Sequence, residues 1–406
     1  MLEAILLVLT IASWVYWIVA WWWVRELTHP RARGDPEFTP PVTILKPVKG
    51  LDFEAYENLR SFCEQDYPEF ELLVGVADST DPVIPVVERV RRDFPGLSIR
   101  LVIAPTMHVN RKASLLHALA SQARYDVLVA SDSDMRVTPD YLRRVVAPFA
   151  DQGVGAVTCP YRGGSPATLT ARLEALHMGV TFLPSVTVAR RFLNMHFALG
   201  ATIALRKNAL DRIGGFEAVA DYLADDYQLG MRIANLGLRV QLSDYIVTCV
   251  LGKTTFQEQW DREVRWARCN RVSRPWEYPG LVLTFSTPLA VLLFVAAPLN
   301  PVTWFVLAIS LLLRWLVAWS VTDSIDNRVL RRWLIWLPVR DMLSALVWCA
   351  GAMGRRLVWR GEEYTVSREG RLMPVKPQTR GRWAGAARAV RSRLTLSVHR
   401  NDKMGS

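Results

Sequence analysis

Short apolar runs alternate with amphipathic stretches between residues 42 and 131. The runs suit buried strands, and the stretches between them repeat their apolar positions at helical spacing. The predicted strands are Val42–Leu45, Phe70–Val76, Ser98–Ile103 and Val127–Ala130, and the predicted helices are Phe53–Gln65, Ile84–Phe94 and Lys112–Gln122. This alternation predicts an α/β fold, in which helices cover both faces of a parallel sheet and form a mononucleotide-binding half.

The second half of this region extends from Val154 to Asp226. It begins with the apolar run Val154–Val157 and reaches another at Gly200–Arg206. Between them, Leu173–Phe197 is hydrophobic over most of its length. This segment forms either a core helix or a hydrophobic groove at the membrane surface that binds an apolar acceptor.

Longer apolar segments flank the α/β region. The first, Ala4–Val24, has 21 consecutive uncharged residues and tryptophans weighted to one end, which is typical of a membrane-spanning helix. We expect a retained anchor over residues 1–25, because a secretory signal would have a basic start, a shorter apolar core and a cleavage site. Arg25 and Arg31 follow the span, and the positive-inside rule places them in the cytoplasm.

A second membrane region is predicted over residues 281–353. Pro298 and Pro301 divide its first part, which is uncharged as far as Leu313, into one span over 281–297 and another over 302–321. Arg314 falls inside the second span, where it is either a side chain that snorkels to the interface or a functional contact, and the first is more common close to a helix end.

The last part of this region contains two apolar pieces, Trp333–Pro338 and Met342–Met353. Arg340 and Asp341 separate them, so neither piece crosses a bilayer alone, and we expect a re-entrant or interfacial pair rather than a third span.

The tail over residues 355–406 holds 13 basic and 4 acidic residues and suits a membrane surface or a disordered segment. It carries most of the net charge of +11, so membrane attraction explains that charge better than binding to nucleic acid. The five cysteines have no paired spacing, which indicates neither a disulfide framework nor a zinc site. A reducing, cytoplasmic catalytic domain over residues 40–255 is the simplest interpretation.

Acidic residues follow the predicted strand at Val127–Ala130. Asp132 and Asp134 stand two positions apart at its carboxyl end, where open α/β sheets bind ligands, and such a pair can hold one hard divalent cation with a diphosphate. Taken alone, the triplet is more simply a polar strand end. Three further loops at this edge favour a nucleotide site, namely Lys46-Pro47-Val48-Lys49-Gly50, the loop that starts at Asp78, and Asn110-Arg111-Lys112. No glycine-rich phosphate loop is present.

Two later segments also carry candidate chemistry. Asp225 and Asp226 begin an amphipathic helix, where they either complement the helix dipole or supply a general base for a hydroxyl. An amphipathic helix is predicted over 256–277, with arginines every third residue at Arg262, Arg265, Arg268 and Arg271. These arginines suit an anionic membrane surface, or they clamp a leaving diphosphate.

Together these motifs resemble the ceramide glucosyltransferases. The resemblance rests on Lys46-Pro47-Val48-Lys49-Gly50, Asp78, Asp132-Ser133-Asp134, Asp225-Asp226 and Arg262-Glu263-Val264-Arg265-Trp266, and it covers about residues 2–364. It implies an inverting membrane enzyme with a Rossmann-like GT-A domain, transferring glucose from UDP-glucose to ceramide at the inner membrane of a bacterium.

The resemblance also implies roles for individual residues. Asp78 would read the uridine or ribose, and Lys46, Pro47 and Lys112 would belong to the donor site. Asp132 and Asp134 would hold the diphosphate through Mn²⁺ or Mg²⁺. Asp226 would be the general base, and Arg262, Arg265 and Trp266 would contact the leaving UDP.

Three alternatives stay open at this point. Hopanoid glycosyltransferases that use UDP-N-acetylglucosamine share almost the same motifs. A processive polysaccharide synthase would normally carry Gln in place of Arg262 and more spans. A catalytically dead scaffold would have eroded acids, yet Asp78, Asp132, Asp134 and Asp226 are all present.

Overall fold

The computed structural model describes residues 1–29, 35, 37–193, 196–359 and 362–375. A seven-stranded sheet lies at its centre, in the order β3-β2-β1-β4-β8-β6-β9. Its strands are β1 (Val42–Pro47), β2 (Phe70–Val76), β3 (Ser98–Ile103), β4 (Val127–Ser131), β6 (Val154–Thr158), β8 (Thr202–Arg206) and β9 (Arg239–Leu242). The part of the predicted basic tail beyond residue 375 lies outside the described residues.

The predicted parallel half of the sheet is confirmed. β1 pairs in parallel with β2 and β4, and β2 pairs in parallel with β3. Every residue of β1 is buried, as the run of apolar residues predicts for a strand covered on both faces. β8 departs from the pattern, because it runs antiparallel to both β4 and β6.

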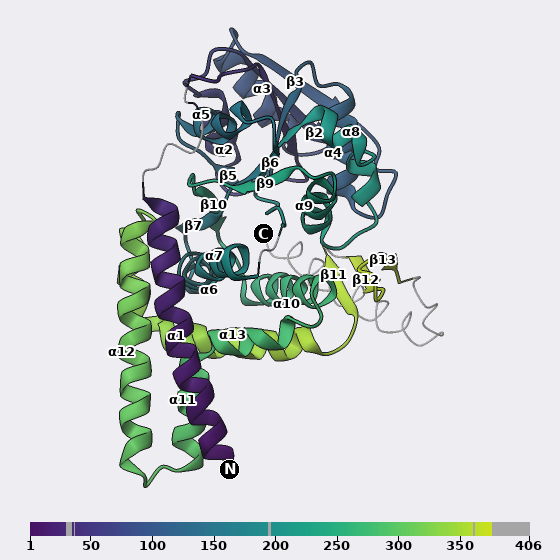
Figure 1. Ribbon diagram of the computed structural model, residues 1–406. Helices are drawn as coiled ribbons and strands as arrows, with labels where there is room; N and C mark the ends of the chain where they lie inside the picture. The colour runs from purple at the N-terminus through teal and green to yellow at the C-terminus, as the bar shows by residue number, and fades with distance from the viewer. Residues whose placement is uncertain (30–34, 36, 194–195, 360–361, 376–406) are drawn as a thin grey trace, which may run out of the picture.

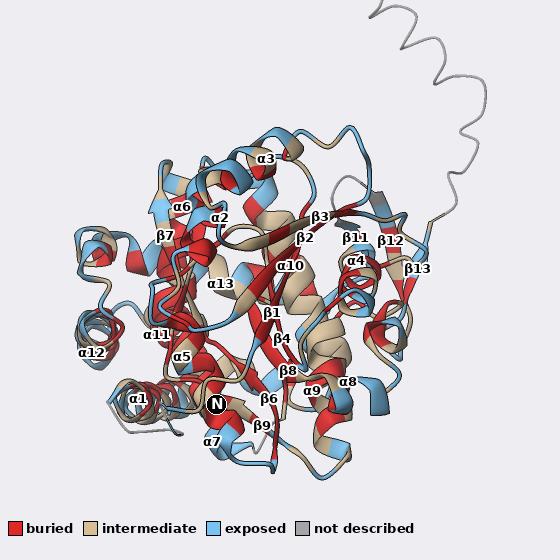
Figure 2. Ribbon diagram, turned by 90° about the horizontal axis from the view of Figure 1, so that it is seen from above, coloured by how far each residue is buried: buried red, intermediate tan, exposed pale blue. Residues whose placement is uncertain are grey.

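Helices cover both faces of the sheet, and successive strand residues feed two separate cores (Figure 2). Ile44 points into the core beneath α2, α3 and α5, whereas Leu45 points into the core beneath α4, α8 and α9. The helices of these two layers are α2 (Ala55–Cys63), α3 (Ile84–Asp93), α4 (Arg111–Ser121), α5 (Tyr141–Val146), α8 (Lys207–Arg212) and α9 (Asp225–Asn235). Short 3₁₀ turns follow at η1 (Ala147–Ala150) and η3 (Phe216–Val219).

Two smaller sheets complete the part of the chain above the membrane-type helices. One has the order β5-β10-β7, formed by β5 (Met135–Arg136), β7 (Tyr161–Pro166) and β10 (Val247–Gly252). The other has the order β11-β12-β13, formed by β11 (Arg356–Trp359), β12 (Glu362–Val366) and β13 (Leu372–Pro374). The second one is built by residues that follow the last long helix.

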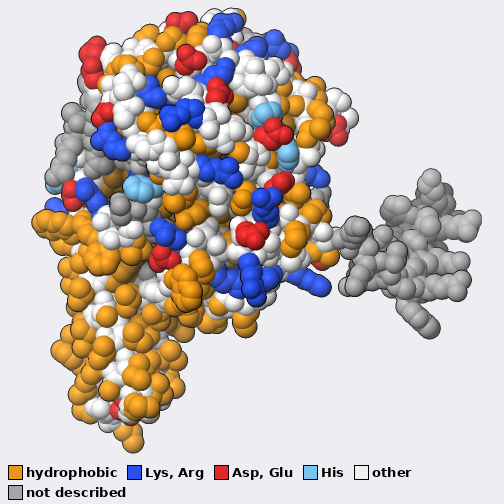
Figure 3. All heavy atoms as spheres, turned by 45° about the vertical axis from the view of Figure 1, so that its right-hand side comes forward, with side chains coloured by type: hydrophobic (Ala, Val, Ile, Leu, Met, Phe, Trp, Pro, Cys, Tyr) orange, Lys and Arg blue, Asp and Glu red, His pale blue; other side chains and the backbone are white. Residues whose placement is uncertain are grey.

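The helices α1 (Leu2–Thr28), α11 (Ser286–Ala296) and α12 (Pro301–Ser324) run together away from the α/β domain and form a stalk (Figure 1). The helices α10 (Phe256–Ser273) and α13 (Leu337–Ala352) lie crosswise where the stalk meets the domain. The segments Leu2–Thr28, Pro301–Ser324 and Arg328–Ala352 are long and apolar enough to cross a membrane. Hydrophobic side chains cover the stalk almost continuously, and basic ones gather above it (Figure 3).

One helical segment lies between the crosswise helices and the sheet. It is continuous through α6 (Leu169–His177), the π-helical turn η2 (Met178–Phe182) and α7 (Leu183–Phe192). It covers most of Leu173–Phe197, the hydrophobic stretch for which the sequence allowed either a core helix or an acceptor groove.

The predicted span over 281–297 is bent near its start. The 3₁₀ helix η4 (Tyr278–Thr284) meets α11 at an angle of 77°. Phe285 leaves the helical conformation at this junction, and Pro288 follows in the first turn of α11, where a missing N–H is tolerated. The final apolar segment is likewise divided, into η5 (Arg328–Trp336) and α13.

Arg314 does not snorkel to the membrane interface, so this interpretation of its charge is wrong. Its side chain is 1% exposed and donates to the Asp341 carboxylate at 3.2 Å and to the Thr181 hydroxyl at 2.8 Å. The guanidinium lies over the Trp17 ring, 3.9 Å from its centroid. Asp341 also accepts a hydrogen bond from Thr287, so one ion pair joins α12, α13, α11 and η2.

Residue 340, next to Asp341 on α13, makes a second buried pair in another direction. The Arg340 guanidinium donates to both carboxylate oxygens of Glu263 on α10, at 2.8 and 2.7 Å. This bidentate geometry is the strong form of an arginine–carboxylate contact. Arg340 and Asp341, adjacent charges in an apolar stretch, therefore connect the helices of the stalk to α10.

We predict that Asp341→Leu strongly destabilises the protein. The substitution leaves the buried Arg314 without its carboxylate, and breaking one side of a buried pair costs about 3 to 5 kcal/mol. The measurement is the apparent Tm of the detergent-solubilised protein, which should fall well below that of the unmodified chain.

The matched comparison is the double variant Arg314→Met with Asp341→Leu. Replacing both charges by apolar side chains removes the uncompensated guanidinium, so the double variant should regain much of the lost Tm. A double variant as unstable as Asp341→Leu alone would contradict the assignment of the loss to the buried charge.

Candidate active site

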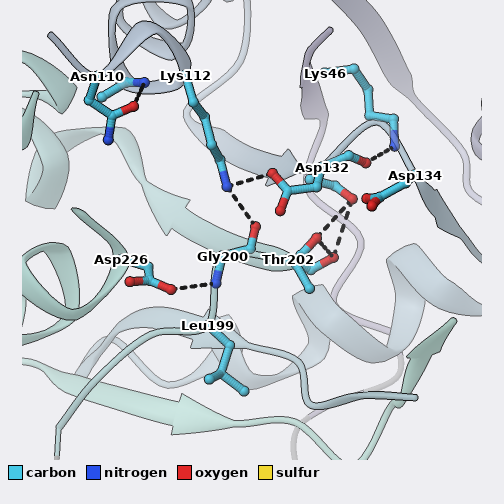
Figure 4. Close-up of polar contacts among 12 residues, drawn as sticks. Lys46, Asn110, Lys112, Asp132, Asp134, Leu199, Gly200, Thr202 and Asp226 are labelled. Carbon is cyan, nitrogen blue, oxygen red and sulfur yellow. Dashed lines mark hydrogen bonds and ion pairs between the residues drawn. The ribbon is translucent and has the colours of Figure 1, made fainter. Parts of the chain in front are cut away.

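The candidate site begins where β4 ends. Lys112, near the start of α4, reaches across to Asp132 with 2.5 Å between Nζ and Oδ1, and it donates to the Gly200 carbonyl at 3.1 Å (Figure 4). Asn110 caps α4 by accepting a hydrogen bond from the Ala113 N–H, which fixes the turn before this lysine. The Lys112–Asp132 pair therefore joins two loops of the sheet edge.

Lys46 supports the acids from beneath and does not face the solvent. Its ammonium donates to the Asp132 carbonyl oxygen at 2.5 Å and lies 3.7 Å from the centroid of the Phe62 ring. The residue is fully buried, and burial lowers its pKa to about 7 against the attraction of Asp134 and Asp132. Its geometry is that of a residue that fixes the acidic turn.

Asp134 lies among more negative than compensating positive charge. Burial, with the negative charges of Asp132 and Asp52, raises its pKa to about 6 against the attraction of Lys46 and Arg262. Its carboxylate has the Cys249 thiol at 3.6 Å, a weak donor. One oxygen of Asp52 is buried with no hydrogen-bond partner. A divalent cation would relieve this excess of negative charge, so the residues fit one.

A cation here would depend on its substrate for further ligands. Within the described residues, no group of three or more His, Cys, Asp or Glu side chains is arranged to hold a metal ion. Mg²⁺ is commonly bound by one or two carboxylates together with phosphate oxygens and water. Asp132 and Asp134 meet that requirement.

Asp226 lies opposite these residues, at the start of α9. Its Oδ2 accepts the Gly200 N–H at 2.9 Å and its Oδ1 accepts the Tyr227 N–H at 2.7 Å (Figure 4). Burial raises the pKa of Asp226, while Lys112 and the two N–H groups oppose the rise. A buried carboxylate with a raised pKa is a stronger base than an exposed one.

Close packing of α9 keeps Asp226 beside Gly200. A Cβ on Gly230 would lie 2.5 Å from the Ala198 nitrogen and 2.8 Å from the Phe197 Cα. Only glycine lets the helix approach this backbone so closely, and the same backbone leads directly into Gly200.

The arginine helix α10 borders the site on its membrane side. It begins with a capping box between Thr255 and Glu258. Arg262 pairs with Glu174 at 3.1 Å, and burial raises the pKa of that carboxyl to about 7. Arg265 and Trp266 lie in the same wall.

Arg268 and Arg271, further along α10, contact backbone carbonyls of the chain after α13. Arg268 donates to Met353 at 3.3 Å, and Arg271 donates to Gly354 at 2.5 Å.

A single cavity of about 1000 Å³ connects all of these elements. Its polar end contains the acids of β4 and the start of α9, and α10 forms one side. The opposite end is apolar and is formed by the junction of η4 with α11 and by α13, through Leu281, Phe285, Val347 and Trp348. The hydrophobic stretch Leu173–Phe197 contributes to both the cavity and the core. Its residues Phe182 and Val186 line the cavity, whereas Leu176 and Val180 are buried in the core.

The structure brings most of the predicted site residues to this cavity. Those that line it are Pro47, Lys112, Asp132, Asp134, Asp226, Arg262, Arg265 and Trp266. Lys46 lies beneath it, as described above. Asp78 is exposed on the same sheet edge, and its carboxylate accepts hydrogen bonds from the Thr80 N–H and hydroxyl, both at 2.8 Å.

Three charged residues in or beside the cavity wall, Glu174, Glu263 and Arg340, are not recognisable as site residues from the sequence. Glu174 holds Arg262, and the Glu263–Arg340 pair ties α10 to α13. One signal was available, because a charge in an apolar membrane-type stretch usually has a buried partner. Arg340 has that signal, whereas Glu174 does not stand out from an ordinary amphipathic helix.

These features define a glycosyltransferase built on the GT-A fold. The profile of glycosyl transferase family 21 matches residues 5–372, and the chain belongs to that family.

Curated relatives agree with this assignment. Ceramide glucosyltransferase 3 of Caenorhabditis elegans is 24% identical over 88% of this chain and 80% of its own length. Ceramide glucosyltransferase 1 of the same organism is 24% identical over 88% of this chain and 78% of its own length. A probable glycosyltransferase of Bacillus subtilis, YdaM, is 24% identical over 61% of this chain and 59% of its own length.

A solved structure shares the fold. It is the mannosyltransferase PcManGT from Pyrobaculum calidifontis, in complex with GDP-Man and Mn²⁺. It superposes with a TM-score of 0.53 at 23% identity, covering 87% of this chain and 98% of the other.

We predict that Gly230→Ala lowers transfer activity and stability together. The added methyl group must push α9 away from the backbone of residues 197–198, and such overpacking typically costs about 1 to 3 kcal/mol. The movement displaces Asp226 from Gly200. The measurements are the apparent Tm and the kcat of transfer.

Gly96→Ala is the matched control. A Cβ on Gly96 meets no atom within 4 Å, and its backbone needs no positive φ. This variant should behave like the unmodified protein. Equal effects of the two substitutions would contradict the packing explanation.

Proposed function

We propose that this protein transfers glucose from UDP-glucose to the primary hydroxyl of ceramide, with inversion, and gives glucosylceramide. The observation that carries the proposal is the shape and polarity of the large cavity described above. It extends from the acids that follow β4 to an apolar wall at the stalk helices. One end suits a charged nucleotide-sugar and the other suits a lipid. The curated relatives named ceramide glucosyltransferases support this choice of donor and acceptor.

The donor would be held at the polar end. Asp132 and Asp134 would hold Mn²⁺ or Mg²⁺, which when bound supplies Lewis-acid stabilisation of the diphosphate. Pro47 lines the same end, and Lys46 fixes the acidic turn from beneath. The loop at Asp78 lies on this edge, where it would reach the uridine or ribose.

Asp226 would act as the general base. Its carboxylate removes the proton from the acceptor hydroxyl as that oxygen forms a bond to the anomeric carbon. The bond from the same carbon to the diphosphate oxygen breaks, and its electron pair leaves with UDP. One in-line displacement inverts the anomeric centre and needs no covalent nucleophile. Two backbone N–H groups orient Asp226 for this step.

The leaving UDP would be stabilised by the arginine helix. Arg262 and Arg265 line the cavity with Trp266, one turn apart on α10. Guanidinium groups stay charged at working pH and bind phosphate oxygens in pairs. Glu174 holds Arg262 in place, so this cation is positioned before the diphosphate develops its charge.

The acceptor would enter from the bilayer. Among the described residues, the segments Leu2–Thr28, Pro301–Ser324 and Arg328–Ala352 are long and apolar enough to cross a membrane. Helix α13, within the third segment, forms part of the apolar end of the cavity. We infer that the enzyme is anchored in the inner membrane of a bacterium, with its α/β domain in the cytoplasm, where nucleotide-sugars are found.

The proposal predicts which mixture of substrates gives product. Purified protein in detergent, supplied with Mn²⁺ and labelled UDP-sugar, should transfer glucose to ceramide. Chelation by EDTA should abolish the reaction and added Mn²⁺ or Mg²⁺ should restore it, because Asp134 has too few positive partners of its own. Labelled glucosylceramide is measured after lipid extraction.

Parallel lanes contain UDP-N-acetylglucosamine and a hopanoid acceptor. Product only on the hopanoid would overturn ceramide as the acceptor and keep the site. Product in EDTA equal to that in Mn²⁺ would overturn the role of the cation. A polymeric product without lipid acceptor would overturn single transfer in favour of a processive synthase.

We predict that Asp226→Asn lowers kcat by about 100-fold or more, since an amide cannot accept the proton. Binding of UDP-glucose should change little, because the base acts on the acceptor. For the unmodified enzyme, transfer should fall as the pH falls through the raised pKa of Asp226, above the value of about 3.9 for an ordinary aspartate. A pH profile of kcat at saturating substrates measures this.

Asp211→Asn is the control, since Asp211 is exposed on α8, away from the cavity. It should retain full activity. Substantial transfer by Asp226→Asn, or an acid limb no higher than that of an ordinary aspartate, would remove Asp226 from the role of base.

A further inference from the structure

The small sheet β11-β12-β13 packs beside the active site although it follows the last long helix of the stalk (Figure 1). Tyr364 of β12 and Val358 of β11 line the cavity together with residues of α10. Residues near the end of the described chain therefore form part of the wall that the substrates would meet.

This sheet holds the loop that leads into Asp226. The Leu223 N–H donates to the Gly370 carbonyl at 2.9 Å, and the Leu372 N–H donates to the Asp221 carbonyl at 2.8 Å. An antiparallel bridge joins Tyr222 to Arg371 between these two bonds. Three consecutive residues of the loop are thus paired like a short additional strand.

Apolar packing reinforces the backbone pairing. Leu223 lies in a buried cluster with residues of all three strands, Leu357, Tyr364, Val366 and Leu372. Each is at most 6% exposed, so the loop residue and the sheet share one small core. Loosening the sheet must therefore loosen the loop two residues before Asp225.

The chain that forms the small sheet is also fixed at its start, where it leaves α13, by hydrogen bonds from the arginine helix α10. Arg268 donates to the carbonyls of Met353 and Arg356, and Arg271 donates to those of Ala352 and Gly354. These carbonyls belong to the end of α13 and the start of β11. Arg268 and Arg271 lie on the same helix as Arg262 and Arg265.

A third set of contacts joins the loop before Asp225 to the turn that precedes Lys112, on the side of the cavity proposed to bind the donor. The Asn110 N–H donates to the Ala220 carbonyl at 3.0 Å, and its side-chain amide donates to the Tyr222 carbonyl at 3.4 Å. Asn110 is the residue that caps α4 just before Lys112. The loop held by the small sheet thus also holds the turn that presents this lysine.

We propose that residues 352–359 and 362–372 form a positioning element of the active site, which fixes the general base relative to the arginines that stabilise the leaving group. The inference rests on the proposed function for the roles of Asp226, Arg262 and Arg265. It adds that the separation of these groups is set by residues that supply neither the base nor the arginines. Small displacements of reacting groups are costly, so such an element affects kcat more than donor affinity.

Leu372→Ala tests the proposal, with Met373→Ala as the matched control. Leu372 is buried against Leu223, whereas the neighbouring Met373 on β13 is 46% exposed. Leu372→Ala should speed amide exchange in peptides covering residues 221–226 by about tenfold or more, since exchange reports local opening. It should also lower kcat by about tenfold or more, with the Kd for UDP-glucose within about twofold. Met373→Ala should change neither.

One further variant keeps the result interpretable. Arg271→Gln loosens the start of the segment at the end of α13 and should lower kcat in the same way, even if Leu372→Ala folds poorly. Full kcat and unchanged exchange in Leu372→Ala would overturn the proposal. Because the exchange measurement needs no acceptor, it tests the sheet separately from the identity of the lipid.

Discussion

The structure depends on a pair of neighbouring charges, Arg340 and Asp341, that face different partners from one crosswise helix. Arg340 binds Glu263 of α10 with two hydrogen bonds, and Asp341 binds Arg314 of α12. Burying four charges carries a large desolvation cost, which is offset only by close and complete pairing. An apolar contact would have tolerated sliding of α13, whereas these directional bonds fix it. The arginine helix is thereby held at one height above the stalk.

The acids of the site follow a second electrostatic constraint. Lys112 neutralises Asp132 directly, and Lys46 lies beneath the same turn. Asp134 and Asp52 are left with less compensation, and the pKa of Asp134 is raised to about 6 mainly by burial. A sheet edge that keeps three carboxylates partly buried, with only partial compensation by nearby cations, favours binding of a positively charged ligand. The fold therefore carries a local imbalance of charge where a donor diphosphate and its cation would bind.

Much of the α/β domain could be predicted because its signals are local. The runs at 70–76 and 98–103 coincide with β2 and β3, since short and mainly apolar runs of this length suit strands. The bend in the predicted span at 281–297 and the burial of Arg314 could not be predicted, because both depend on tertiary partners. Arg314 finds Asp341 at a separation of 27 residues, and periodicity contains no information about such a pairing.

The site itself was predictable as a set of residue types and not as an arrangement. Asp132 and Asp134 follow a strand and were recognisable from that position. Lys46 was recognised in the same way, at the end of another strand, but it is buried beneath the acids. What separates these cases is packing around Phe62, which no motif encodes. The same reasoning applies to the small sheet at the end of the described chain. Its strands are short and unremarkable in sequence, yet their backbone groups pair with the loop before Asp226, so the geometry of the base depends on contacts made some 150 residues away along the chain, of which the Leu372–Asp221 hydrogen bond is one.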